Sequence, residues 1–234
     1  MPNTPLFPAL QKVGLNLQAA FNLCDLPEPL RTKLLGASQS DQAFKQVILI
    51  GHGGKDLWQA LQAQPSNAID PIDEFSRQQI STCLQEAIGK RAFEFLYPGD
   101  HLLGLQELGV YAGWHNPSLL RIGIMEKWGT WFAYRAVVLA DSNLATSKPL
   151  SASSLCQTCT SKACVEACPA IAVGTKSFAA NDCFSWRAED KSPCAKTCLA
   201  RRACPVAKEH TYSEDQQAYH YGLSLKAIKR ANLA

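Results

Sequence analysis

The chain has 234 residues, of which 47% are hydrophobic and 18% charged, and its formal net charge is +3. This composition provides enough apolar residues for a folded core and argues against disorder, while the small net charge does not predict nucleic-acid binding. No run approaches the roughly 18 apolar residues of a membrane span, and the first residues lack the pattern of a secretory signal. We therefore expect a cytoplasmic protein with no membrane span and no nucleic-acid partner.

The ten cysteines are unevenly distributed along the chain. Cys24 and Cys83 are isolated in the first 150 residues, whereas the other eight lie between Cys156 and Cys204. In a reducing compartment such a concentration indicates metal ligation rather than disulfides. The small polar residues of 146–154 separate the two compositions. The sequence therefore predicts an N-terminal domain at 1–148 and a cysteine-rich domain at 149–234.

A strand, a glycine turn and a helix are the first predicted elements. The apolar run 47–50 reads as a strand that the glycines of 51–54 end, and a helix follows from about residue 56. A glycine turn between a strand and a helix can present backbone N–H groups to an anion. Alternatively, the glycines form a simple sharp turn.

The next predicted element is a helix at 70–90. Pro71 suits its first turn, and its apolar residues form one stripe on which Cys83 is expected to be buried. A short strand at 93–96 and a helix at 102–108 are expected to follow.

The segment 109–141 combines tryptophans with a long apolar run. It is predicted to form a turn, a short strand, a hairpin-like turn and a long strand, at 113–118, 122–125, 126–131 and 132–140. On the long strand Tyr134 and Arg135 face opposite sides. A buried arginine must pair with an internal carboxylate or with an anionic group of a ligand, and the residues alone favour neither.

The cysteine spacing indicates iron–sulfur ligation. The run 156–168 has the pattern C-x2-C-x4-C-x3-C followed by proline, and in bacterial two-cluster ferredoxins the fourth cysteine of such a run binds the other cluster. The usual pattern has two residues where this chain has four, which resembles ferredoxin-like subunits of membrane oxidoreductases. We assign the first cluster to Cys156, Cys159, Cys164 and Cys204, and the second to Cys168, Cys183, Cys194 and Cys198. The eight thiols then match two [4Fe–4S] clusters.

Zinc and disulfides also remain open as interpretations of the cysteines. A zinc site needs four thiolates in tetrahedral geometry, usually as two close pairs, and the pairs 156/159 and 194/198 would leave four cysteines without a role. His210 and His220 are expected to be structural or solvated rather than ligands. The last segment is predicted to form a helix with Ser213 as its N-cap.

Polar groups near the cysteines have two interpretations each. Ser185, Trp186 and Arg187 either hydrogen-bond or shield a cluster, or form a turn beside a buried aromatic. The cations of this region either raise the reduction potential of a negatively charged cluster or form a solvated basic surface: Lys191, Lys196, Arg201, Arg202 and Lys208.

Three stretches of the N-terminal region, DPIDEF, the AGW turn and GTWFAYRAVVL, resemble the decyanating and dealkylating cobalamin-processing chaperones, over roughly residues 40–142. The tail resembles that of epoxyqueuosine reductase and the reductive dehalogenases, with a four-cysteine run, a lone cysteine and a closing Cys-Pro. These resemblances imply an α+β protein. Its nitroreductase- or flavin-reductase-like domain would be followed by a small bacterial ferredoxin-like domain.

The resemblance also implies a cofactor site over the sheet, for cobalamin or alternatively FMN. The residues implied in binding are Trp114, His115, Trp128, Gly129, Trp131, Tyr134 and Arg135. The catalytic aspartate of epoxyqueuosine reductase corresponds to Leu103, with Asp100 and His101 nearby. We therefore do not expect the tRNA reductase activity, and the sequence identifies no catalytic residue.

Three functional hypotheses follow. In the first, two [4Fe–4S] clusters pass single electrons to a corrinoid or flavin held by the N-terminal domain, so that the protein reduces or processes cobalamin as an oxidoreductase. In the second, the chain is a ferredoxin-type electron carrier whose N-terminal domain only docks partners. In the third, it is a degenerate member of the family with no small cofactor in that domain. An electron-donor protein or reductase is an expected partner.

Overall fold

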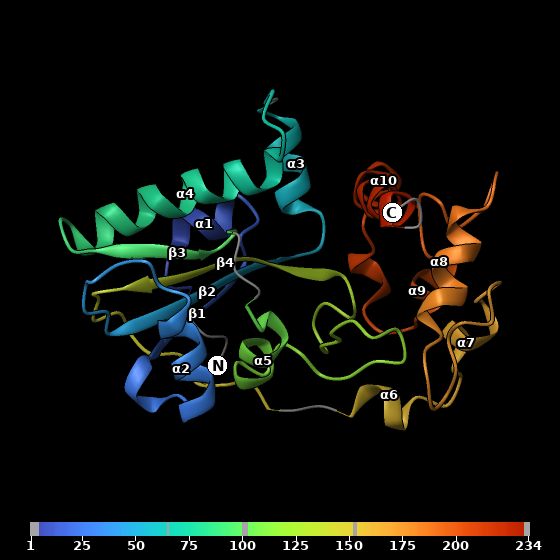
Figure 1. Ribbon diagram of the computed structural model, residues 1–234, viewed down its shortest axis with the longest axis horizontal. Helices are drawn as coiled ribbons and strands as arrows, with labels where there is room; N and C mark the ends of the chain where they lie inside the picture. Colours follow the sequence, from blue (N-terminus) through green and yellow to red (C-terminus); the bar gives the residue numbers. More distant parts are fainter. Residues whose placement is uncertain (1–4, 65, 100–102, 152–153, 232–234) are drawn as a thin grey trace. The chain divides into compact units, whose positions relative to one another are not determined.

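The computed structural model describes residues 5–64, 66–99, 103–151 and 154–231 (Figure 1). The chain forms two compact units that do not coincide with a single cut in the sequence. The first unit contains the residues up to Gly113 together with Phe132–Leu150. The second contains Trp114–Trp131 and the residues from Ser151 onward. The chain therefore passes between the units three times.

The first unit is built on a small antiparallel sheet of order β1-β2-β4-β3. Its strands are β1 (Leu17–Asn22), β2 (Gln46–Gly53), β3 (Phe93–Tyr97) and β4 (Phe132–Ala140). The two central strands consist mainly of Val, Ile, Leu and Ala, and residues 47–50 and 136–140 have no exposed surface. Strands that are apolar on both faces must be covered on both faces, and helices lie on both sides of this sheet (Figure 1).

The helices of the first unit are α1 (Pro8–Lys12), η1 (Leu23–Asp25), α2 (Glu28–Gly36), α3 (Asp56–Gln62), α4 (Pro71–Ile88) and α5 (Leu105–Tyr111). The long helix α4 packs against β4, α1 and α3 on one side of the sheet. The other side carries α5, whose Tyr111 ring packs edge-on against Phe21 of β1 at a centroid distance of 5.0 Å. Lys33 of α2 forms an ion pair with Glu107 of α5 at 2.6 Å, which joins these two helices.

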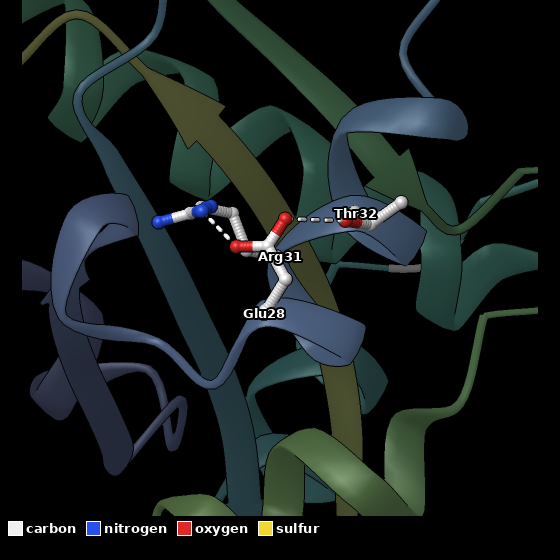
Figure 2. Close-up of polar contacts among 3 residues, drawn as sticks. All are labelled: Glu28, Arg31 and Thr32. Atoms are coloured by element: carbon white, nitrogen blue, oxygen red, sulfur yellow. Dashed lines mark hydrogen bonds and ion pairs between the residues drawn. The ribbon is translucent and has the colours of Figure 1, made fainter.

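Helix α4 confirms the predicted helix and its start. Asp70 is the N-cap, and its carboxylate accepts a hydrogen bond from the backbone N–H of Asp73 at 3.2 Å. The predicted apolar stripe, Cys83 included, is buried. Helix α2, which lies at 28–36, has a local polar cluster on its surface. There the Glu28 carboxylate accepts hydrogen bonds from Arg31 and Thr32 (Figure 2).

Three predicted boundaries need correction. The strand expected to end at residue 50 continues to Gly53, because Gly51, His52 and Gly53 pair with the start of β4 beyond a bulge at Ile50/Gly51. The turn therefore falls on Gly54, which has φ +75°. The strand expected at 122–125 is reduced to isolated bridges at Ile124 and Met125.

The helix expected at 102–108 is α5 at Leu105–Tyr111. Residue 102, Asp100 and His101 lie outside the described residues. No element was predicted before residue 47, where the structure has α1, β1, η1 and α2.

The second unit consists of short helices and loops around the clustered cysteines. Its helices are α6 (Leu155–Thr158), α7 (Ala163–Glu166), α8 (Ala180–Ala188), α9 (Leu199–Ala203), η2 (Lys208–His210) and α10 (Glu214–Ala231). Helix α7 packs against α9, and α8 packs against α10. As predicted, Ser213 caps the last helix, since its hydroxyl accepts from the backbone N–H of Gln216 at 3.4 Å. The protein is thus a mixed α/β structure with a small antiparallel sheet, which confirms the predicted α+β class.

In the described part of the chain, no helix combines the length and the apolar character needed to cross a membrane.

Candidate functional site

Four of the eight clustered cysteines surround one cavity in the second unit. Cys168, Cys183, Cys194 and Cys198 line this cavity, whose volume is about 230 Å³. Cys183 lies on α8, and Cys198 is the N-cap of α9, where its sulfur accepts a hydrogen bond from the backbone N–H of Arg201 at 3.4 Å. The cysteine spacing assigns these four cysteines to one cluster, and in the structure all four line the same cavity.

The rest of the cavity wall is mainly apolar and contains a few polar groups. Its apolar side chains include Leu120, Ile122, Val173, Phe178 and Phe184. The polar side chains in the wall are Trp186, Arg187, Thr197, Arg201 and Tyr221. The indole N–H of Trp186 is buried and has no hydrogen-bond partner within the described residues. Most buried donors in proteins are hydrogen-bonded, so this N–H is an exception.

The pKa values of the thiols reflect their proximity. Burial raises the pKa of Cys183, and neighbouring Cys198, Cys168 and Cys194 raise it further, while Arg187 opposes the shift. Burial likewise raises the pKa of Cys194, with contributions from Cys198 and Cys168. Thiolates that lie close together in an apolar site disfavour each other's charge. An added positive centre would reverse that effect, because it favours the deprotonated form of each sulfur.

The other four cysteines form a second group. Burial raises the pKa of Cys164, and Cys204, Cys156 and Cys159 raise it further. For Cys204 the causes are burial first and then, among the charges, the neighbouring Cys156 and Cys159. The cysteine neighbours named here all belong to this group. They are the four cysteines that the spacing assigns to the first cluster, and their binding of a cluster stays a prediction.

The loop around Cys159 is arranged to stabilise a thiolate. The pKa of Cys159 is lowered, mainly by a hydrogen bond from the backbone N–H of Lys162 and also by the Ser161 hydroxyl. Lys162 has a left-handed backbone with φ +44°, and its ammonium donates to the Cys156 carbonyl. Hydrogen bonds to sulfur are among the features that tune iron–sulfur clusters.

Within the residues described, no group of three or more His, Cys, Asp or Glu side chains is arranged to hold one metal ion. Four thiolates around a zinc ion must each lie about 2.3 Å from the metal. In a [4Fe–4S] cluster each thiolate binds a different iron atom, so the sulfurs are more widely spaced. The donor set of each group, four thiols with no carboxylate, suits such a cluster.

The residues implied in cofactor binding are divided between the two units. Tyr134 and Arg135 lie on β4 in the first unit, and the other five lie in the segment 114–131 of the second. Arg135 faces α4, whereas the hydroxyl of Tyr134 lies so close to Gly109 of α5 that a Cβ there would be 1.8 Å from it. The structure therefore does not bring these two side chains together. Burial raises the pKa of Tyr134 above the range of ordinary phenols.

Arg135 has partners inside the first unit. Its Nε donates to Nδ1 of His52 at 3.0 Å, and its Nη1 lies 4.0 Å from the Asp73 carboxylate. Arg135 is 8% exposed and His52 is 1% exposed. Of the two alternatives for a buried arginine, the internal carboxylate is present, although at a distance longer than a direct hydrogen bond. Burial raises the pKa of Asp73, and Asp70 raises it further while Arg135 lowers it.

The segment 114–131 packs against the residues on either side of Cys204 through Trp128, Gly129 and Trp131. The Trp128 ring lies 4.3 Å from the ring of His210. The Trp131 ring lies 4.2 Å from the Arg201 guanidinium. Gly129 has φ +55°, and a Cβ at this position would lie 2.4 Å from the Val206 carbonyl oxygen. These contacts fix the segment 114–131 to the cysteine-containing part of the second unit.

Trp114 and His115 complete the predicted set. Trp114 is buried, and partial burial lowers the pKa of His115, because desolvation disfavours the imidazolium ion. Sequence reasoning did not single out His52, Asp73 and Tyr97 as a polar group around Arg135. Burial raises the pKa of Tyr97, and Arg135 lowers it, which places Tyr97 near the same guanidinium. The sequence feature that could have indicated this polar group is His52, a histidine in an otherwise apolar strand.

No family model matches the chain, and no curated protein matches it in sequence. Solved structures do match. The fold is similar to that of epoxyqueuosine reductase. A selenomethionine-labelled crystal structure of that enzyme gives a TM-score of 0.54 at 12% identity, covering 91% of this chain and 67% of its own.

Two further structures of epoxyqueuosine reductase agree with this match. One, with an epoxyqueuosine-modified tRNA-Tyr stem loop, gives a TM-score of 0.53 at 13% identity and covers 91% of this chain. The other, from Bacillus subtilis with its catalytic loop swung out of the active site, gives 0.53 at 14% identity and covers 89%. The present chain spans 64–67% of the length of the matched epoxyqueuosine reductases. Because the match covers more of the chain than either unit contains, the likeness to epoxyqueuosine reductase includes parts of both units.

Proposed function

We propose that the chain is an iron–sulfur redox protein in which two [4Fe–4S] clusters deliver single electrons to a corrinoid or flavin held by the first unit. The observation that carries the iron–sulfur part is the division of eight cysteines into two groups of four. One group lines a common cavity, and the members of each group influence one another's pKa. Each cluster, when bound, supplies one-electron transfer.

The surroundings of the thiols support a cluster better than a zinc ion. The cavity wall is largely apolar, and its polar residues include Arg187 and Arg201, whose positive charges would offset that of a negatively charged cluster. In the other group, backbone N–H donation to Cys159 would stabilise the ligating thiolate. A zinc ion would need four sulfurs about 2.3 Å from one centre, whereas a [4Fe–4S] cluster fills a larger space between its four thiolates.

The corrinoid part of the proposal rests on two kinds of likeness. The fold is similar to that of epoxyqueuosine reductase across both units. The motifs DPIDEF, AGW and GTWFAYRAVVL resemble cobalamin-processing proteins. A nitroreductase-like first domain, a ferredoxin-like second domain, a cytoplasmic location and an electron-donor protein as partner belong to the same proposal. The residue implied in binding from the first unit is Arg135, together with Tyr134 on the other face of β4.

A pure electron carrier is the second candidate, and the internal pairing of Arg135 favours it. Arg135 is buried and already contacts His52 and Asp73, so its charge is partly satisfied without a ligand. Trp128 and Trp131 are likewise packed within the second unit rather than free to wall a ligand pocket. In this case the first unit would serve as a docking module, or as a family fold that has lost its small cofactor.

The experiment that separates these candidates has two stages. The protein is first reconstituted anaerobically with iron and sulfide, and the proposal expects eight irons and eight inorganic sulfides per chain, the content of two [4Fe–4S] clusters. Zinc bound in place of iron would overturn it. The loaded protein is then titrated with cobalamin while the visible spectrum is recorded. A saturable shift toward the base-off spectrum is expected.

The titration is repeated with Arg135→Gln, and with Arg31→Gln as a control on the surface of α2. Loss of the shift in the first variant alone would assign a binding role to Arg135. Absence of any shift in the wild-type protein with intact clusters would refute the corrinoid part. The same titration with FMN would then decide between a flavin protein and a carrier.

A further inference from the structure

Arg187 occupies a buried position beside the cavity of the second cysteine group. It lies four residues after Cys183 on α8, so both side chains project from the same face of the helix. Arg187 is 7% exposed and, like Cys183, lines the cavity. The position is therefore built into the wall that the ligand cysteines share.

The guanidinium is held in place by neutral groups. Its Nε donates to the Cys194 carbonyl at 3.3 Å, its Nη1 to the Ser224 hydroxyl at 3.1 Å and its Nη2 to the Tyr221 carbonyl at 3.0 Å. The Tyr221 ring lies 5.1 Å from the guanidinium carbon. Three directed hydrogen bonds and a ring contact leave this side chain little freedom.

Among the described residues, no carboxylate forms an ion pair with Arg187, and the ion pairs that do form involve other cations. A buried charge without a counter-ion is strongly destabilising, and neutral hydrogen bonds recover only part of this cost.

We propose that Arg187 is a fixed counter-charge of the cluster bound by Cys168, Cys183, Cys194 and Cys198, and that it raises the reduction potential of that cluster. The inference rests on the proposed iron–sulfur function and goes beyond it by assigning a tuning residue. Each electron that enters a cluster increases its negative charge. A nearby immobile cation therefore stabilises the reduced form more than the oxidised form.

Because Arg187 is buried, we expect it to change the reduction potential of the cluster more than the exposed cations of the unit do. The apolar wall of the cavity screens charge poorly, whereas water screens the exposed cations. Lys208, near Cys204 of the other group, contacts the surrounding water. Arg202 on α9 is also on the surface and lies 3.9 Å from the Glu214 carboxylate, which already offsets its charge.

The test is an EPR-monitored potentiometric titration of the anaerobically reconstituted protein. The signal of this cluster is identified by its loss in Cys183→Ala. Arg187→Gln removes the charge but keeps N–H donors for hydrogen bonds. Arg187→Lys keeps the charge but loses the planar arrangement of N–H donors that the guanidinium provides. Arg202→Gln is the matched control for loss of a surface arginine.

We expect Arg187→Gln to shift this cluster to a lower potential and to leave the other cluster unchanged. Arg187→Lys and Arg202→Gln should keep the wild-type potential. A fully loaded Arg187→Gln protein with the wild-type potential would overturn the proposal. If Arg187→Gln fails to hold the cluster, an Arg187→Lys protein that retains it at the wild-type potential supports the role of charge. Loss of the cluster in both variants would show that the hydrogen bonds matter and would also overturn it.

The iron content and the potentials of the wild-type protein separate the proposed function from the role of Arg187. A wild-type protein that incorporates no iron and sulfide refutes the proposed function itself. A wild-type protein with both clusters whose potentials ignore the charge at residue 187 refutes only the role of Arg187.

Discussion

Nε of Arg135 donates a hydrogen bond to Nδ1 of His52 over 3.0 Å in the buried interior of the first unit. Acceptance at Nδ1 requires that this nitrogen carries no proton, so His52 is the neutral tautomer with its proton on Nε2. The contact joins β4 to β2 just beyond the bulge. It makes His52 a direct polar support of the arginine in the GTWFAYRAVVL motif.

Removal of this acceptor should destabilise the protein. His52→Phe keeps an aromatic ring but leaves the Nε–H of Arg135 without its partner, and an unsatisfied buried donor costs about 1–3 kcal/mol. Chemical denaturation should show that loss, while Lys12→Ala on the exposed surface of α1 should leave the free energy of unfolding unchanged. Equal stability of His52→Phe and wild type would mean that the hydrogen bond does not contribute.

Asp73 should lower the free energy of unfolding as the pH rises, which is the opposite of the usual effect of a carboxyl group. Its pKa is raised by burial and by Asp70, so the folded state binds a proton more tightly than the unfolded state. Stability therefore falls as the pH rises from the ordinary carboxyl value of 3.8 through the raised value. Asp73→Asn should lack this decline when unfolding is measured across that range.

Asp141 provides the control of opposite sign. Its pKa is lowered, chiefly by a hydrogen bond from Lys45, so its contribution is present above 3.8 and is lost as the pH falls through the lowered value. Asp141→Asn should therefore lose stability at neutral pH relative to acid pH. Parallel pH profiles for the two variants would contradict the assigned shifts.

The two cysteine groups should lose their clusters independently. Cys183→Ala should halve the iron content and remove one EPR signal, and Cys164→Ala should remove the other, because each residue's cysteine neighbours belong to its own group. The exposed Cys24 belongs to neither group, so Cys24→Ala should keep the full iron content. Loss of the same signal in both variants would refute the division into two groups.

Gly129 should resist substitution for two reasons. Its φ of +55° costs a residue with a side chain about 1–2 kcal/mol, and a Cβ there would collide with the Val206 carbonyl at 2.4 Å. Gly129→Ala should therefore lower the unfolding temperature. Gly222→Ala on α10, where a Cβ meets nothing within 4 Å, should raise stability by about 0.5–1 kcal/mol. A neutral Gly129→Ala would show that the segment 114–131 can move away from residue 206.

The grouping of the cysteines is a prediction from their spacing, which is local information for the run 156–168. Cys156, Cys159 and Cys164 are brought together by one tight loop, and the order of the remaining cysteines then restricts their partners. Helix α4 was predictable for the same reason, since its cap and its apolar stripe lie within one stretch.

The surroundings of Arg135 could not be predicted, because they depend on register between distant strands. The register shift at Ile50/Gly51 leaves Arg135 of β4 without a partner residue on β2, and it decides which residues of β4 lie beside His52. The strand before residue 47 was missed because β1 has only six residues, of which three are Ala or Asn. Those residue types favour strands weakly.

The interleaving of the two units has a consequence for biosynthesis. Trp128 and Trp131 leave the ribosome well before Arg201, His210 and Tyr212, the residues against which they pack. Until the last third of the chain has been made, these two indole rings have no native partners from that segment, and exposed aromatic surface of this kind invites aggregation. A fragment that stops after the sheet would keep this vulnerability permanently, and a fragment that begins at residue 151 would lack the tryptophans at 128 and 131 altogether.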